Sequence, residues 1–415
     1  MDINDMIELR LVMEIHTSGR RSFRSCRRRW DWIFNERWYP FMTAKPLEFG
    51  VAYHKAMEVY YAPETWNQPR VVVAEEAIQV FISKCEQQKA DALKYSNRLY
   101  FDDDVDTDYA ERVELGRGML NYYFTQVAPI LDQHWYPIRV EIGFFTPIPN
   151  PHTGETIYCK CAECWEKWTN YVDTVELNSG YVPLAVQETE LEQWEGLPVV
   201  YAGRLDMLAK DAREGYWIFD WKTARAISKD DEFLYLDDQV GSYVWALWKL
   251  GIPLEGFVYH EQRKGYPQPP KMNKVRRLGC IFSVAKNQDV DYDTYLETVK
   301  NEDTSAYEEG YYDEMLEYLK NEGTAYFARH QIHKSHDELR EIERNIGLEA
   351  LEMVNPDLAI YPSPGRFGCN FCAFRQPCLE ANARRDPLEV LSTLFERRDH
   401  YYIRAEASTE SKGAE

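Results

Sequence analysis

Hydrophobic and polar positions change their spacing twice along the chain. In the first third, apolar residues recur at every third or fourth position, most clearly over 46–61 and 70–95, which predicts amphipathic helices. From Trp135 the spacing falls to two, in short runs rich in Val, Ile, Tyr and Trp that Gly, Pro and Asn interrupt. This pattern predicts β-strands. The runs cover 134–148, 180–191, 197–210 and 215–223.

Helical spacing returns towards the C-terminus. It covers 238–250 and most of the chain after Tyr292, including 308–320 and 333–353, while 255–260 and 279–284 are expected to be further strands. The order of elements predicts an α/β protein whose central mixed sheet is flanked by helices from both ends of the sequence. The expected regions are a helical part at 1–134, a sheet core at 135–290 with a Cys-rich insertion at about 149–168, a helical part at 291–403, and a disordered tail at 404–415.

Composition narrows the class of protein. A chain of 415 residues with 45% hydrophobic content can bury a large core, and it has no apolar run near the ~18 residues of a membrane span. The N-terminus lacks the features of a signal peptide, so we expect a cytoplasmic protein without membrane contact. The net charge of −21, from 48 basic and 69 acidic side chains, argues against non-specific binding to polyanions. Nucleic-acid binding would therefore need a local explanation.

The nine cysteines fall into two groups of three, with Cys26, Cys85 and Cys280 at single positions. Three of the nine lie within 369–378, and in a reducing compartment such crowding predicts a shared metal or cluster rather than disulfides. A second group comprises Cys159, Cys161 and Cys164 with His152 nearby, a donor set that suits Zn²⁺. The spacing C-x-C is less usual in zinc knuckles than C-x-x-C, so purely structural cysteines remain the alternative there. Cys85 and Cys280 are expected to be small buried hydrophobes.

The segment GRLDMLAKDAREGYWIFDWKTA, residues 203–224, carries the candidate chemistry. A hairpin centred on Arg213 would place Asp206 opposite Asp220, with Lys222 on the same face of the second strand as Asp220. Two opposed carboxylates repel by up to ~1 kcal/mol, and a divalent cation would remove this repulsion. The expected ligands are Asp206, Asp220, the Trp221 backbone carbonyl and Glu188 of the preceding predicted strand. Lys222 would orient or deprotonate the attacking water and stabilise charge on a phosphate. A simple surface ion pair between Asp220 and Lys222 is the alternative.

The strands GRLD and DWK resemble the active-site signature of the PD-(D/E)XK nuclease superfamily. DQVGSY, with Gln239 and Tyr243 one helical turn apart, is similar to the Q-x-x-x-Y motif of its RecB-like branch, and GVAYHKAME places His54 as the first motif of that branch does. The resemblance implies a restriction-endonuclease-like core and catalysis with Mg²⁺ or Mn²⁺. It also implies His54 as an additional metal ligand, and Gln239 and Tyr243 as active-site residues.

A second resemblance concerns the cysteines near the two ends. SFRSCRRRWDWIF resembles the N-terminal motif of the iron–sulfur branch of this family, although Arg27 stands in place of the usual proline. That branch includes CRISPR-associated, AddAB-type and phage-encoded exonucleases. It implies that Cys26, Cys369, Cys372 and Cys378 hold a [4Fe–4S] cluster joining the N- and C-terminal parts. A zinc ion on the same four cysteines is the competing interpretation. The resemblance spans 22–379.

Taken with these resemblances, the sequence predicts a metal-dependent DNA exonuclease acting on single-stranded ends. It would work in a bacterial, archaeal or phage-infected cell, with a protein partner in repair, recombination or CRISPR adaptation. A catalytically idle DNA-binding or scaffold subunit of such a complex is the alternative. A sequence-specific endonuclease would need a recognition domain that the pattern does not contain. The basic residues expected to contact DNA are Arg24, Arg27, Arg28, Lys274 and Arg276.

Overall fold

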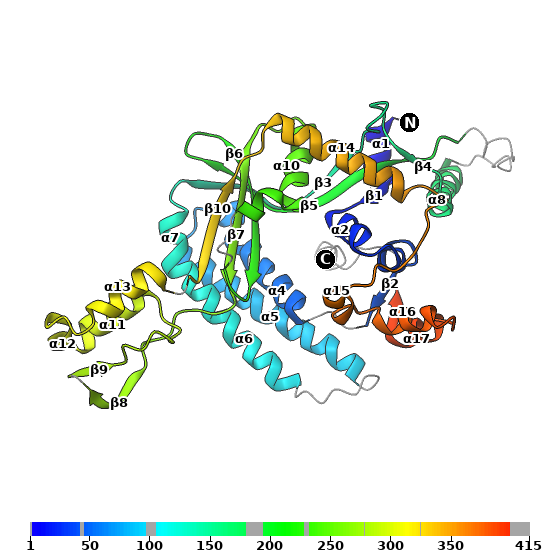
Figure 1. Ribbon diagram of the computed structural model, residues 1–415. Helices are drawn as coiled ribbons and strands as arrows, with labels where there is room; N and C mark the ends of the chain where they lie inside the picture. Colours follow the sequence, from blue (N-terminus) through cyan, green and yellow to red (C-terminus); the bar gives the residue numbers. More distant parts are fainter. Residues whose placement is uncertain are drawn as a thin grey trace.

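A mixed β-sheet forms the centre of the protein. The computed structural model describes residues 2–41, 45–96, 105–179, 194–227, 232–277, 279–323 and 325–398. Within these ranges the sheet has seven strands, five of them in the order β1-β5-β6-β7-β10, with β3 and β4 also paired to β5 (Figure 1). The predicted α/β class with a central mixed sheet is therefore confirmed.

Strand β5 (Leu197–Asp211) organises the sheet. One edge of β5 carries β3 (Trp135–Pro147) and β4 (Tyr158–Cys159), both antiparallel. On the other edge, β1 (Met13–Ile15) runs parallel to 199–201 and β6 (Tyr216–Ala224) runs antiparallel to 207–210. Among the described strands none pairs with 202–206 on that edge, so β5 has a gap there between two neighbours. Beyond β6 follow β7 (Leu254–Arg263), which is parallel to β6, and β10 (Phe327–Ile332), which is antiparallel to β7.

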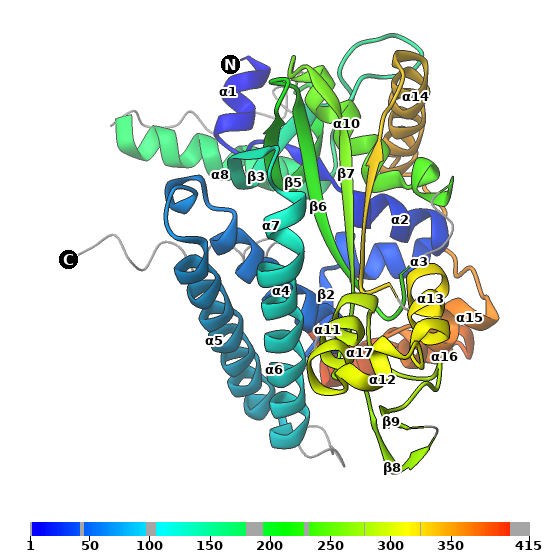
Figure 2. The ribbon, with the colours of Figure 1, turned by 90° about the vertical axis from the view of Figure 1, so that its left-hand side faces the viewer.

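Helices cover both faces of the sheet, as Figure 2 shows with the strands between them. Met207, Phe219 and Val258 belong to one buried cluster, together with side chains of α4 (Lys45–Tyr60), α5 (Arg70–Ser96) and α6 (Val105–Tyr122). Leu208, Ile218 and Phe257 belong to a second cluster, with α2 (Thr17–Ser25), α10 (Asp238–Lys249) and α14 (His336–Met353). Burial on both faces explains why β5 and β6 are apolar almost throughout.

Two smaller units extend from this core. Between β7 and β10 the chain forms a projecting module with its own buried cluster around Tyr295 and Tyr312 (Figure 1). The module contains β8 (Met272–Arg277), β9 (Cys280–Phe282), α11 (Tyr292–Glu302), α12 (Thr304–Glu308) and α13 (Asp313–Glu322).

The second unit joins the N- and C-terminal regions. Strand β2 (Trp38–Pro40) pairs with β11 (Phe395–Arg397), and Trp32 packs near Phe374 in a shared apolar cluster. Segments more than 350 residues apart in the chain thus lie together, next to α15 (Arg366–Asn370), α16 (Arg375–Asn382) and α17 (Leu388–Leu394). Within the described ranges, the remaining α-helices are α1 (Ile3–Glu8), α3 (Arg27–Trp30), α7 (Ala128–Leu131) and α8 (Ala162–Ser179). Short π- and 3-10 turns complete the described segments: η1 (Asp31–Asn35), η2 (Pro63–Thr65), η3 (Tyr123–Val127) and η4 (Glu232–Leu236).

The structure differs from the predicted pattern at several elements. Strands β1 and β10 lie outside the predicted core range 135–290, because a three-residue strand and the polar strand FARHQI carry no clear period of two. Helix α8 begins within the Cys-rich insertion and was not predicted. The helix expected at 308–320 is interrupted between α12 and α13. The predicted strand at 180–191 and the predicted tail at 404–415 lie outside the described residues.

In the described part of the chain, no helix combines the length and the apolar character that crossing a membrane requires.

Candidate active site

The β5–β6 hairpin has the register that a centre at Arg213 predicts. Its ladder runs from Lys210 opposite Tyr216 to Met207 opposite Phe219. One step further along this register stand Asp206 and Asp220, where regular pairing ends and the gap in the edge of β5 begins. Both aspartates are buried, with exposed fractions of 8% and 2%. The predicted juxtaposition of two carboxylates on neighbouring strands is confirmed.

A third carboxylate, Glu141, reaches the same level from the other edge of β5. Val140 lies opposite Met207 and Ile142 opposite Leu205, so the register places Glu141 opposite Asp206. The backbone of Glu141 is left-handed, with φ of 50°, a conformation that costs free energy in a residue other than glycine. Glu141 was not among the predicted site residues. The only signal for it in the sequence is an acidic residue within the apolar run 134–148.

Helix α4 contributes His54 to this group. His54 Nδ1 lies 3.2 Å from Asp206 Oδ1, and single ligand atoms of His54, Glu141 and Asp206 all lie within 4.8 Å of one another. Burial disfavours charge on His54, but Asp206 outweighs that effect and raises the pKa of the imidazole. The pKa of Asp206 is lowered in turn, because His54, Lys222 and the Trp221 backbone N–H together outweigh its burial.

Asp220 makes one polar contact with its own strand and one with α10. Lys222 Nζ lies 2.5 Å from Asp220 Oδ2, and Gln239 Nε2 donates a hydrogen bond of 2.8 Å to Asp220 Oδ1. Burial raises the pKa of Asp220 to about 6; Lys222 opposes this shift and the charge of Asp206 adds to it. Burial also disfavours charge on Lys222, but Asp220 and Asp206 outweigh it and raise the pKa of Lys222. Lys222 is therefore a cation in this environment.

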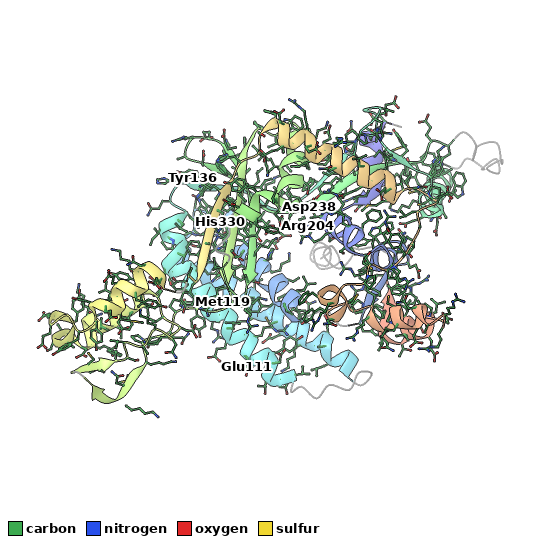
Figure 3. The ribbon with its side chains drawn as sticks, viewed as in Figure 1. Glu111, Met119, Tyr136, Arg204, Asp238 and His330 are labelled. Atoms are coloured by element: carbon green, nitrogen blue, oxygen red, sulfur yellow. The ribbon has the colours of Figure 1, made fainter. Side chains whose placement is uncertain are left out.

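Tyr243, one turn of α10 beyond Gln239, belongs to the buried apolar cluster between the sheet and α10. It is 9% exposed and packs edge-on against Phe144 of β3, with ring centroids 5.2 Å apart. Near these residues, Arg204 Nη1 approaches Glu141 Oε2 at 3.5 Å; Figure 3 labels Arg204. Of the residues predicted for the site, Glu188 lies outside the described residues. The Trp221 backbone stands between Asp220 and Lys222, and its N–H is bonded to Asp206.

The donor set fits a hard divalent cation. Burial and the neighbouring Asp206 charge raise the pKa of Glu141, so ionised carboxylates at Glu141 and Asp220 are both disfavoured in the protein alone. A cation among them would offset this repulsion, and carboxylate oxygens with one imidazole suit Mg²⁺ or Mn²⁺. His54, Glu141 and Asp206 form the group of potential ligands that lie within 4.8 Å of one another, and Asp220 stands beside this group on β6.

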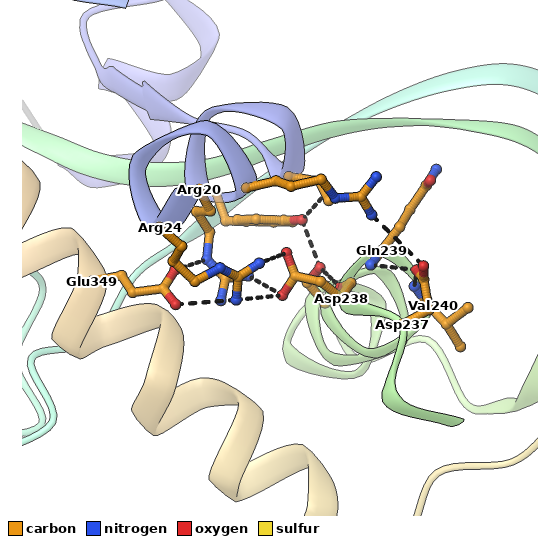
Figure 4. A network of polar contacts seen from close by, with 11 residues as sticks. Arg20, Arg24, Asp237, Asp238, Gln239, Val240 and Glu349 are labelled. Atoms are coloured by element: carbon orange, nitrogen blue, oxygen red, sulfur yellow. Dashed lines mark hydrogen bonds and ion pairs between the residues drawn. The ribbon is translucent and has the colours of Figure 1, made fainter. Parts of the chain in front are cut away.

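The arginines predicted to contact DNA have partners within the protein. Arg24 bonds Asp238 of α10 and Glu349 of α14, and the buried Arg20 pairs with the same two carboxylates (Figure 4). Arg27 pairs with Glu352, and Arg28 donates to Asn382 Oδ1. These pairs fasten the N-terminal segment to the rest of the protein and reduce the charge offered to a phosphate. Lys274 is exposed on β8, whereas the Arg276 side chain lies outside the description.

The four cysteines from the two ends of the chain lie in the unit that joins these ends. Arg28 Nη1 is 3.5 Å from Cys378 Sγ, while the Ser363 and Gly365 backbone N–H groups donate to Cys26 and Cys369. Burial raises the pKa of Cys372; a backbone hydrogen bond and Arg29 oppose the shift, and Cys26 and Cys369 add to it. The sulfur from the N-terminal segment is thus an electrostatic neighbour of the C-terminal triplet.

The insertion cysteines form a separate group, while the single cysteines are buried as predicted. Cys159, Cys161 and Cys164 place their sulfurs within 4.8 Å of one another, and among the described residues His152 does not belong to this group. Cys85 is 0% and Cys280 3% exposed.

The fold and the site together define a class of protein. A mixed sheet carries two aspartates and a lysine on adjacent strands, and these stand beside further groups able to bind a divalent cation. A family model described as the PD-(D/E)XK nuclease superfamily matches residues 17–379, and the chain belongs to this superfamily. It is therefore a metal-dependent nuclease by family. A search of curated proteins finds no match to this chain.

Proposed function

We propose that this protein is an exodeoxyribonuclease that hydrolyses single-stranded DNA from its ends and carries a [4Fe–4S] cluster on Cys26, Cys369, Cys372 and Cys378. The observation that carries the catalytic part is the alignment of Glu141, Asp206 and Asp220 on three adjacent strands, with Lys222 beside Asp220. A nuclease that had lost its activity would have no need to keep these buried charges.

The roles of the site residues follow from their contacts. His54, Glu141, Asp206 and Asp220 would hold a divalent cation, which supplies Lewis-acid activation of water and phosphate when bound. Gln239 orients the Asp220 carboxylate through its amide. Lys222, held as a cation 2.5 Å from Asp220, would stabilise negative charge on a phosphate oxygen during attack. Its charge supports this electrostatic role over that of a proton acceptor.

A cavity at the start of α10, the helix that carries Gln239, supports a single-stranded substrate. It has a volume of about 690 Å³ and is lined by side chains of α2, η4, α10 and α14, among them Arg21, Phe233 and Tyr235 and the acids Asp237, Asp238, Glu338 and Glu341. Phe233 and Tyr235 are 62% and 48% exposed, which would allow them to stack on unpaired bases. Duplex DNA keeps its bases stacked inside and cannot use such contacts.

The iron–sulfur part rests on the resemblance and on the joining of the two ends of the chain. A four-iron cluster holds its cysteine sulfurs farther apart than one ion does, because each sulfur binds a different iron atom. Arg28 beside Cys378, with backbone N–H groups directed at Cys26 and Cys369, would stabilise the negative charge of a thiolate-bound cluster.

Digestion of end-labelled DNA tests the catalytic proposal. Linear single-stranded DNA should be degraded with Mg²⁺ or Mn²⁺, circular single-stranded DNA should resist, and duplex DNA should be cut more slowly. Lys222→Ala should reduce the rate by roughly 10²–10³-fold. Lys210→Ala, which removes a lysine paired with Glu214 on the same hairpin, is the matched control and should retain activity. Full activity in both Asp206→Ala and Lys222→Ala would refute the site. If the wild type binds DNA but does not digest it, the alternative of a catalytically idle DNA-binding subunit would be favoured.

A further inference from the structure

The turn between β4 and α8 brings three cysteines together at a distance from the carboxylates. Cys159 ends β4 opposite Leu197, the first residue of β5. Asp206 lies further along the same strand, about 30 Å away at ~3.3 Å per residue. The insertion group is therefore a site of its own, and chemistry at Asp206 does not involve it.

The separation of the sulfurs fits one ion. All three lie within 4.8 Å of one another. A zinc–thiolate bond is ~2.3 Å long, so two sulfurs on a tetrahedral zinc ion are about 3.8 Å apart. Small adjustments of the side chains would bring the three sulfurs onto a single ion.

Burial alone does not account for this grouping. Cys159 and Cys164 are 2% and 0% exposed and belong to the apolar core, where single thiols behave as small hydrophobes. Cys161 is exposed, so its side chain gains no free energy from burial. Its sulfur nevertheless lies within 4.8 Å of the two buried sulfurs, a position that a shared ion would explain.

The described residues offer three donors to this site. No fourth His, Cys, Asp or Glu joins the group within the described ranges. His152 stands in a turn that packs against α14: a Cβ atom added to Gly347 would meet the Pro149 carbonyl oxygen at 2.6 Å and Pro151 Cδ at 2.9 Å. This close packing holds the turn against α14. The predicted contribution of His152 has no support in this arrangement.

We propose that Cys159, Cys161 and Cys164 bind one Zn²⁺ ion through three thiolates and leave its fourth position to an exchangeable ligand on the exposed side of Cys161. Strand β4 has only two residues, and so short an edge strand gains little from pairing. The ion would fasten the end of β4 to the first turn of α8. This site is independent of the proposed nuclease activity.

Metal analysis of the full-length protein, purified without oxygen, tests the proposal. The exposed residue gives the cleanest variants, since Cys161→Ala should leave the core intact. We expect it to lose one zinc ion per chain, while Cys161→His, which restores a zinc donor, retains the ion. Cys85→Ala, which removes a buried thiol outside both groups, should have the wild-type zinc content. Replacement of zinc by Co²⁺ should produce the visible absorption of tetrahedral cobalt–thiolate in the wild type and not in Cys161→Ala.

Several outcomes would overturn the proposal. One is equal zinc content in the wild type and Cys161→Ala. Another is loss of zinc in Cys369→Ala with retention in Cys161→Ala, which would place the ion at the other cysteine group. A disulfide among the three insertion cysteines in the anaerobic protein would also refute it. Because none of these measurements uses DNA, failure of this proposal and failure of the nuclease proposal can be told apart.

Discussion

The backbone N–H of Trp221 donates a hydrogen bond of 2.8 Å to Oδ2 of Asp206. This bond joins β5 and β6 just beyond the last regular pair of their ladder, Met207 and Phe219. A side chain thus replaces a backbone acceptor at the point where the strands separate. The sheet itself therefore orients Asp206. The donor residue, Trp221, stands between Asp220 and Lys222 in β6. The geometry of the site consequently depends on where pairing stops.

Glu141→Gln should weaken metal binding without unfolding the protein. Glutamine keeps the shape and the Cβ atom of the side chain but removes the charge opposite Asp206. We expect the affinity for Mn²⁺ to fall by at least about tenfold, as titration calorimetry would measure. Glu214→Gln in the hairpin turn removes an exposed acid paired with Lys210 and is the matched control. Unchanged Mn²⁺ affinity in Glu141→Gln would exclude Glu141 from the site.

Asp220→Asn should abolish activity but stabilise the metal-free protein at neutral pH. Burial raises the pKa of Asp220 to about 6, whereas its value in the unfolded chain is ~3.9. The native state binds the proton more tightly, so wild-type stability falls as pH rises from about 4 to about 6 and stays lower above that range. The variant lacks this loss. With a chelator present at pH 7, its free energy of unfolding should exceed that of the wild type by about 1–3 kcal/mol.

Denaturant unfolding at pH 4, 6 and 8 measures this difference. Adding Mg²⁺ should stabilise the wild type more than the variant, because only the wild type keeps the full ligand set. Asp211→Asn on the same hairpin is a control that should lower the free energy of unfolding at neutral pH. There the Arg213 and Gly215 backbone N–H groups and the Trp217 indole donate to the carboxylate, and its pKa is lowered. Greater stability of the wild type than of Asp220→Asn at pH 8 in chelator would contradict the argument.

Cys372→Ser should remove the visible absorption of an iron–sulfur cluster and lower thermal stability. The cysteine lies in the unit that joins β2 to β11, so loss of a cluster would loosen the attachment of the C-terminal segment. Absorption spectra, iron analysis and thermal unfolding of the anaerobic protein provide the measurements. Cys85→Ala, which removes a buried thiol of α5, should keep the visible absorption of the cluster. A colourless wild type that contains zinc on these cysteines would favour the competing zinc interpretation.

Two helical glycines should respond to alanine in opposite directions. A Cβ atom at Gly116 of α6 would lie 2.0 Å from Phe81 Cζ in the core, whereas nothing lies within 4 Å of one at Gly50 of α4. Gly116→Ala should destabilise the protein by about 1–3 kcal/mol through overpacking. Gly50→Ala should stabilise it by about 0.5–1 kcal/mol, because alanine loses less backbone entropy in a helix. Urea unfolding of both variants tests this; shifts of the same sign would contradict it.

Local patterns in the sequence were sufficient for the longer elements and for one half of the site. The spacing of apolar residues predicts α4, α5, α10, β3, β5 and β6, since each is long enough to show its period. The turn at Asp211–Gly215 sets the register of a single hairpin, so the juxtaposition of Asp206 and Asp220 follows from distances along the chain. Lys222 follows from the alternation of a strand.

Contacts between distant segments were decided only by the tertiary structure. Glu141 meets Asp206 because β3 pairs along the far edge of β5, and no local pattern specifies which strands become neighbours. The short strands β1 and β10 join the sheet because their backbone groups find partners there, although their sequences are too brief or too polar to show a period. Likewise, Arg24 and Arg27 were expected to contact DNA, but carboxylates of α10 and α14 pair with both of them. The sequence by itself determined which residues could bear charge; the packing of remote elements decided which charges meet, because electrostatic energy depends on distance in space and not on separation along the chain.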